Sequence, residues 1–295
     1  MRYQRLPQQM IGMALVLLCL AGCGSEPAQP SGRGGTNEAA DLSPLGVLQS
    51  TDHGGTWTSL GNAYMSDLMV EPADPTGFAT DSGVVLYFVD LSSLSQPVPH
   101  SIYRVASTDG VNFDRPQPVY TQTEAMVDPC VLPMQDGTFR LYVPSGGATI
   151  SAASADGLAF ALEDGARITE GGMPGGLLLP DNRVRMFVCL GGIFSHISDD
   201  GLNFKREDGM RISSSPGTFV DNPQPLRLRD GTYLMLYQSA AESSVGQVDG
   251  WRKEIHLATS TDGYNWATNP AVIATGGTSA LVEMPDGTLL IYYGN

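Results

Sequence analysis

The segment Ser198–Phe204 reads Ser-Asp-Asp-Gly-Leu-Asn-Phe, and its pattern of Ser, Asp, Gly and an aromatic residue recurs along the chain. The other copies are Ser50–Trp57, Ser107–Phe113, Ser154–Phe160 and Ser260–Trp266. The Asp side chain can bond the local backbone, the Gly accepts a positive φ, and the aromatic ring packs back between strands. Each copy is therefore predicted to be a tight hairpin turn between two strands.

A second repeat alternates with the first and centres on an Asp-Gly or Asp-Asn turn between two apolar runs. Pro129–Val143 aligns without gaps on Pro174–Val188 and on Pro223–Tyr237, and shorter copies are Asp81–Val89 and Val282–Tyr293. Two hairpins per unit make a four-stranded blade. Five such units predict an all-β fold, a five-bladed β-propeller over residues 44–295. The alternative is a β-sandwich whose turns match by coincidence.

The order of the two repeats predicts how the propeller closes. The chain ends just after an inner hairpin, and near Leu45 it begins with an outer hairpin that has no inner partner. We therefore expect the N-terminal hairpin to complete the last blade, so that no seam stays open.

The first 43 residues are interpreted as processing signal and tether rather than fold. Arg2 and Arg5 precede an apolar run from Met10 to Leu20, which is too short to span a bilayer and is typical of a secretory signal. Residues 20–23, Leu-Ala-Gly-Cys, resemble the bacterial lipoprotein box, which implies a signal over residues 1–22 and a lipid on Cys23. Residues 23–43 are then a flexible tether. An ordinary signal peptide with a chance Cys is the alternative.

The charge composition of the chain limits which kinds of partner it can bind. The chain of 295 residues has 16 Lys and Arg against 31 Asp and Glu, a formal net charge of −15. Without a basic surface to neutralise phosphates, a nucleic-acid partner is excluded, and the acidic surface argues against direct docking on anionic lipid. We expect a monomer held at the membrane only through Cys23. No Asp follows that Cys, which favours the outer membrane, on its periplasmic or cell-surface side.

Cysteine and histidine spacing predicts no metal site and no cofactor. Cys130 and Cys189 remain in the mature chain, in an oxidising compartment, and the sequence leaves open whether they pair.

Candidate site residues lie at the starts of the inner strands, which line the central channel of a propeller. The first blade offers Glu71 and Asp74, the second Asp128, the third Glu170 and Met173, the fourth Asp221 and Asn222, and the fifth Thr278 and Ser279. Carboxylates that converge on one mouth suit glycoside chemistry, in which one is protonated as general acid and another stays ionised.

This alternation of an Asp-Pro inner hairpin with an Asp-Gly outer turn resembles the five-bladed glycoside hydrolases of family 43 and the related invertase group. The resemblance implies a base or nucleophile from the first blade, either Asp74 or Glu71. It implies Asp128 as the acid that tunes pKa, in Val127-Asp128-Pro129, and Glu170 as general acid. The family often places a Gly-His pair where this chain has Thr275–Ser279.

The function expected from these residues is hydrolysis of extracellular glycans by a surface lipoprotein. Asp221, Asn222, Thr278 and Trp251 are the predicted substrate contacts, Trp251 because it ends a long loop that begins at Ala240. A non-catalytic propeller that binds carbohydrate or protein is the alternative. A sialidase is suggested by the full Asp-box at Ser50–Trp57 but is less favoured. Sialidases have six blades, whereas the repeats here predict five, and the chain has no Arg-Ile-Pro signature.

Overall fold

The computed structural model describes residues 45–93, 99–244 and 253–294. The predicted signal, the tether with Cys23, and Trp251 lie outside these ranges. Within them, the only helices are two short 3-10 turns, η1 (Leu91–Ser93) and η2 (Glu242–Ser244). None of the described segments forms a helix with the length and hydropathy to cross a membrane.

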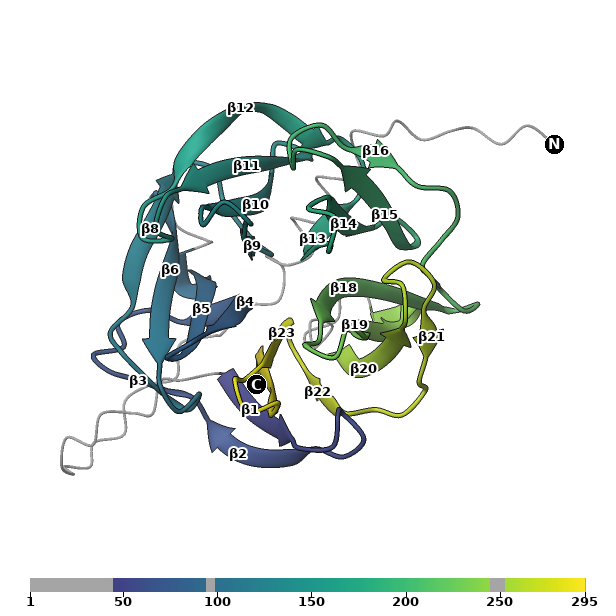
Figure 1. Ribbon diagram of the computed structural model, residues 1–295, viewed down its shortest axis with the longest axis horizontal. Coiled ribbons are helices and arrows are strands. Elements are labelled where there is room, and N and C mark those ends of the chain that lie inside the picture. Colours follow the sequence, from purple (N-terminus) through teal and green to yellow (C-terminus); the bar gives the residue numbers. More distant parts are fainter. Residues whose placement is uncertain (1–44, 94–98, 245–252, 295) are drawn as a thin grey trace, which may run out of the picture.

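Five antiparallel sheets surround a central axis (Figure 1). Blade 1 contains β4 (Pro72–Thr80), β5 (Gly83–Asp90), β6 (His100–Ser107) and β8 (Gln117–Gln122). Blade 2 contains β9 (Cys130–Pro133), β10 (Phe139–Ser145), β11 (Ala148–Ser154) and β12 (Ala161–Ile168). The five-bladed propeller predicted from the repeats is therefore confirmed.

Blades 3 and 4 each have a fourth strand split in two. Blade 3 contains β13 (Gly172–Leu178), β14 (Val184–Cys189), β15 (Gly192–Ser198), β16 (Lys205–Arg206) and β17 (Ile212–Ser213). Blade 4 contains β18 (Thr218–Arg227), β19 (Tyr233–Ala241), β20 (Lys253–Ser260), β21 (Ala267–Thr268) and β22 (Ala274–Gly276).

Blade 5 joins the two ends of the described chain. Its strands are β23 (Ser279–Glu283), β24 (Leu289–Gly294), β1 (Leu45–Ser50) and β2 (Thr58–Asn62). β1 pairs antiparallel with β24 along its whole length, from Leu45 opposite Gly294 to Ser50 opposite Leu289. The N-terminal hairpin completes the last blade, as predicted. A short parallel pair, β3 (Tyr64–Met65) with β7 (Asn112–Phe113), joins blades 5 and 1 and was not predicted.

The repeated Asp turns have a common hydrogen-bond pattern. In the copy at Ser198, Asp200 Oδ1 accepts bonds from the Ser198 hydroxyl and from the amides of Leu202 and Asn203, each at 2.8 Å. Gly201 has φ 69°, a left-handed conformation that glycine adopts at no steric cost. One carboxylate thus organises the turn, and these turns lie at the end of the propeller opposite the inner-strand starts.

Apolar side chains fill the space between neighbouring blades, with Leu86 and Leu141 among the fully buried ones. Four junctions also carry a latch, in which a side chain on the second strand of one blade donates to the turn-glycine carbonyl of the next. The latches are Tyr87 to Gly157, Tyr142 to Gly201, Arg185 to Gly263 and Tyr292 to Gly110, at 2.8–3.0 Å. These bonds join neighbouring blades at four of the five junctions.

Candidate active site at the axial mouth

A ring of left-handed residues marks the starts of the inner strands. Asp74, Asp128, Met173 and Asn222 have φ between 49° and 53°, and each directly precedes a proline. Non-glycine residues rarely adopt this conformation, and they concentrate where function requires a fixed side-chain direction. Four blades therefore place equivalent side chains at one end of the axis.

Asp74 is the centre of the contacts between blades 5, 1 and 2. Its Oδ1 accepts the Thr278 hydroxyl at 2.6 Å, and its Oδ2 accepts the Asp128 amide at 3.1 Å. Asp128 is 9% exposed, and no hydrogen bond from any described residue reaches its carboxyl oxygens. The structure thus brings the predicted acids Asp74 and Asp128 together, with one carboxyl anchored and the other unanchored.

Asp221 and Lys253 contribute an ion pair from blade 4. Lys253 Nζ contacts Asp221 Oδ2, and both side chains are nearly buried, 12% and 10% exposed. The second oxygen of Asp221 is buried and has no partner among the described residues. Lys253 Nζ also lies 5.2 Å from the centre of the Phe219 ring. Together Asp74, Asp128, Asp221, Lys253 and Thr278 form what we call the axial cluster.

Burial dominates the electrostatics of the axial cluster. It raises the pKa of Asp128 well above the usual range, and the negative charges of Asp74 and Asp221 add to this, while Lys253 opposes it. Burial also raises the pKa of Asp74, although its bonds from Thr278 and the Asp128 amide favour the ionised form. The pair is therefore arranged so that Asp128 keeps its proton more readily than Asp74.

Burial likewise raises the pKa of Asp221, against the influence of Lys253. Burial disfavours the charge on Lys253, but Asp221 and Asp128 outweigh it and raise the Lys253 pKa, so the amine stays protonated.

Asn222 braces the wall of the mouth. Its side-chain amide donates to Gln238 Oε1 at 3.1 Å, and Gln238 in turn donates to the carbonyl of Gly277 at 2.6 Å. Its backbone amide donates to Cys189 Sγ at 3.2 Å. Cys189 and Cys130 are both free thiols, which answers the question that the sequence left open.

Two predicted catalytic acids, Glu170 and Glu71, share no hydrogen bond or ion pair with the axial cluster among the described residues. Glu170 is bound by His196 Nε2 at 3.0 Å and by Arg206 at 2.6 Å, on the outer strands of its own blade. No hydrogen bond or ion pair among the described residues joins Glu170 to Asp74 or Asp128. Glu71 is exposed, and its contacts are made by its backbone with Asp90 and Leu91. Of the two predicted first-blade acids, Asp74 is the one that contacts Thr278 and Asp128 of the neighbouring blades.

The sequence did not point to Lys253 as a site residue. It is one of only two lysines in the chain and opens β20, and this rarity was the one available signal. Its approach to Asp221 depends on how β20 pairs with β19, which no local motif reveals.

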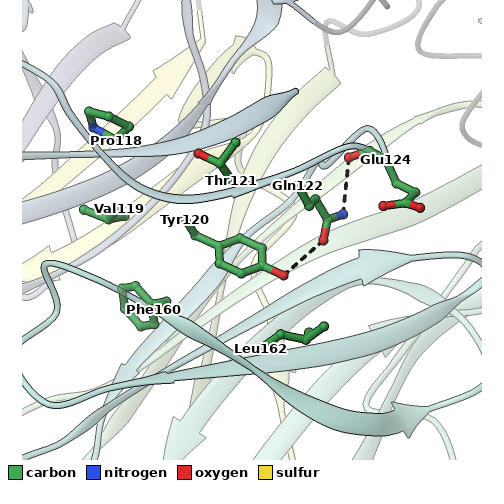
Figure 2. Close-up of a pocket in the computed structure, with 8 residues that line it drawn as sticks. All are labelled: Pro118, Val119, Tyr120, Thr121, Gln122, Glu124, Phe160 and Leu162. Atoms are coloured by element: carbon green, nitrogen blue, oxygen red, sulfur yellow. Dashed lines mark hydrogen bonds between the residues drawn. The ribbon is translucent and has the colours of Figure 1, made fainter. Parts of the chain in front are cut away.

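The perimeter of the propeller carries hollows separate from the axial cluster. One, of about 580 Å³, lies between β8 and β12, with Tyr120 between Phe160 and Leu162 on one side and Thr121 on the other (Figure 2). The Tyr120 hydroxyl donates to Gln122, so this polar group is already satisfied internally. Within residues 45–93, 99–244 and 253–294, no group of three or more His, Cys, Asp or Glu is arranged to bind a metal ion.

Known structures share this architecture. An endo-arabinase from Bacteroides thetaiotaomicron superposes with a TM-score of 0.60 at 16% identity, over 78% of this chain and 91% of that one. The fold is that of the five-bladed family-43 glycoside hydrolases. A thermostable family-43 glycoside hydrolase gives 0.57 at 15% identity, over 78% and 86% of the two chains. No family profile matches the sequence, and no curated protein matches it.

Proposed function

We propose that this protein hydrolyses a glycan at the axial mouth, with Asp128 as proton donor and Asp74 as base. The observation that carries the proposal is the pair itself: two carboxyl groups from neighbouring blades, Asp74 half-buried and anchored by two hydrogen bonds, and Asp128 buried and unanchored. Glycosidases work with two carboxyl groups whose environments separate their roles. The shared fold with family-43 enzymes supports the same chemistry.

In the proposed reaction, Asp128 gives its proton to the glycosidic oxygen as the bond between that oxygen and the anomeric carbon breaks. A water molecule attacks the anomeric carbon, and Asp74 accepts the proton that the water loses. The fragment that keeps the glycosidic oxygen leaves as an alcohol, and the fragment that carries the anomeric carbon becomes a hemiacetal, so atoms and charge balance. Asp221 and Thr278 face the same mouth and are the proposed substrate contacts.

The assignment of the proton donor departs from the one that the family resemblance implies. Glu170 already has one oxygen on Arg206 and the other on His196, whereas the Asp128 carboxyl has no such partners. The test is release of reducing sugar from arabinan, xylan and glucan by the wild type, Asp128→Asn and Glu170→Gln. We expect Asp128→Asn to lose about 10²-fold or more of the rate and Glu170→Gln to lose less than about tenfold.

A larger loss in Glu170→Gln than in Asp128→Asn would return the donor role to Glu170. Absence of turnover by the wild type on every substrate would overturn hydrolysis. The second candidate function is glycan binding without hydrolysis. The ion pairs of Glu170 with His196 and Arg206 favour this candidate, because they leave the third blade without an unpaired acid for catalysis.

We also propose that the propeller is presented at the outer membrane by a lipid on Cys23. The support is the Leu20–Cys23 box and the tether that follows it. Incorporation of a fatty-acid analogue into the wild type but not into Cys23→Ser tests this. Equal labelling of both proteins would overturn it.

A further inference from the structure

The junction between blades 4 and 5 differs from the other four. In the aligned second strands, one position holds Tyr87, Tyr142, Phe187 and Tyr292 in the latched blades, and Leu236 in blade 4. Two residues earlier, Arg140 and Arg185 reach the turn of the next blade, but blade 4 has Leu234. No side chain of blade 4 in the described ranges donates to a turn carbonyl of residues 53–55. The latch is absent here.

A hollow of about 730 Å³ opens at the turn end of blade 4, and His53 of blade 5 borders it from across the unlatched junction. Three turns border it: His53 in the turn after β1, Asp230 and Thr232 in the turn after β18, and Asn265 and Trp266 in the turn after β20. The turn at His53 is one residue longer than its four counterparts. All three turns lie at the end of the propeller opposite the axial cluster. The hollow is therefore a second feature, outside the proposed catalytic mouth.

The hollow offers both kinds of contact that a sugar ring requires. Trp266 is half-buried and lines the hollow, and its ring makes a T-shaped contact with Phe187 of blade 3 at 5.8 Å between ring centres. Around it lie the exposed side chains of Asp230, Thr232 and Asn265. Thr232 donates to Asp230 Oδ1 and Asn265 Nδ2 donates to Asp262, so the acceptors left for a ligand are Asp230 Oδ2 and Asn265 Oδ1. Aromatic faces stack on the C–H faces of sugars, while carboxylate, hydroxyl and amide groups bond their hydroxyls.

Charge selects among possible ligands. No Lys or Arg lines the hollow, and His53 lies 3.9 Å from Asp230, so its local charge is small and not positive. On a chain of net charge −15, this disfavours phosphate or carboxylate ligands. The volume lies within the range of about 300–1,000 Å³ that small-molecule sites occupy.

We propose that the hollow at the turn end of blade 4, bordered by His53 of blade 5, is a second, non-catalytic binding site for a neutral oligosaccharide. Trp266 is the stacking surface, and Asp230 and Asn265 bond the sugar hydroxyls. A site on the face opposite the mouth would hold a glycan polymer on the protein independently of catalysis. This proposal goes beyond the proposed hydrolysis, because its residues are not those of the axial cluster.

The test uses the full chain with Asp128→Asn, titrated calorimetrically with neutral arabino-, xylo- and gluco-oligosaccharides. Thr259 is exposed at the border of the hollow, so Thr259→Trp should fill it. The matched control is Thr121→Trp, the same change in the other hollow (Figure 2). We expect Thr259→Trp to remove one bound sugar or weaken that site by about tenfold or more, and Thr121→Trp to leave binding unchanged.

His53→Gly is a milder variant that suits the positive φ of 57° at this position, and we expect it to weaken the site about threefold. It carries the test if Thr259→Trp does not fold. Titrations of Thr259→Trp and His53→Gly that match the parent would overturn the second site. So would the absence of any bound oligosaccharide in the parent. Absence of hydrolysis by the wild type, with oligosaccharide still bound at this site, would instead count against the axial proposal alone.

Discussion

The aspartates of the five turns and those of the axial cluster are the same residue type in opposite environments. Asp200 is exposed and accepts bonds from two backbone amides, a hydroxyl and an amide side chain, which lower its pKa. Asp128 is buried with no such donors, and its pKa is raised. Hydrogen-bond donors from the local backbone stabilise the ionised carboxylate of the turn and lower its pKa, whereas burial without donors raises the pKa toward the range that a proton donor needs.

The largest expected effect is on the rate of hydrolysis, and it tests the aspartates of the axial cluster. Asp74→Asn should reduce hydrolysis by about 10²–10⁴-fold, because the amide cannot accept the proton from water. It should change the midpoint of thermal unfolding little, since the amide oxygen can still accept the Thr278 hydroxyl or the Asp128 amide. Hydrolysis rates and thermal melts of the same preparation check both. An active Asp74→Asn would contradict the assignment of the base.

The ion pair of the axial cluster should give the next largest effect, on stability. Lys253→Met leaves Asp221 buried beside Asp128 and Asp74 without a compensating cation, and should cost about 3 kcal/mol of unfolding free energy. Adding Asp221→Leu should recover most of this loss, because the uncompensated charge is gone. Denaturant unfolding of the single and the double variant measures both changes in unfolding free energy. Equal stability of the single variant and the wild type would show that the pair is not buried in solution.

A smaller effect is expected at the turns. Asp200→Ala removes four hydrogen bonds, but the turn is exposed to water, so we expect a loss of only about 1 kcal/mol. Activity should be unchanged, since the turn lies at the opposite end of the blade from the axial cluster. Urea unfolding and a hydrolysis assay test the two parts. A loss of activity without a loss of stability would break the division between structural and reactive aspartates.

The two groups should also respond oppositely to pH. The pKa of Asp52 is lowered from 3.8 to about 2, chiefly by the Thr56 amide and hydroxyl, so its contribution is present above 3.8 and is lost as pH falls toward 2. Asp128 has a raised pKa, so its contribution is full below 3.8 and is lost as pH rises through the raised value.

Thermal melts across pH can separate the two responses. Asp52→Asn should therefore flatten the acid side of the stability profile slightly, and Asp128→Asn the neutral side. Identical profiles for the two variants would contradict the comparison.

Most of the architecture was predictable from local chemistry. The Asp turns and the Asp-Gly hairpins use contacts between residues within four positions of each other, so their spacing alone predicted strands, blades and closure. The ring of Asp74, Asp128 and Asn222 was also visible, as polar residues before prolines at inner-strand starts. What the sequence could not predict was which acids meet. Glu170 has a partner, Arg206, that lies 36 residues away.

The sequence by itself determined the repeat, the blade count and the end of the propeller at which acids gather, because these depend on short-range turn chemistry and strand alternation. The tertiary structure alone decided that Asp74 touches the Asp128 amide 54 residues away and that Lys253 faces Asp221. It also decided that blade 4 lacks its latch to blade 5. These contacts join different blades or strands, and burial, which sets their charge states, exists only once the ring has closed.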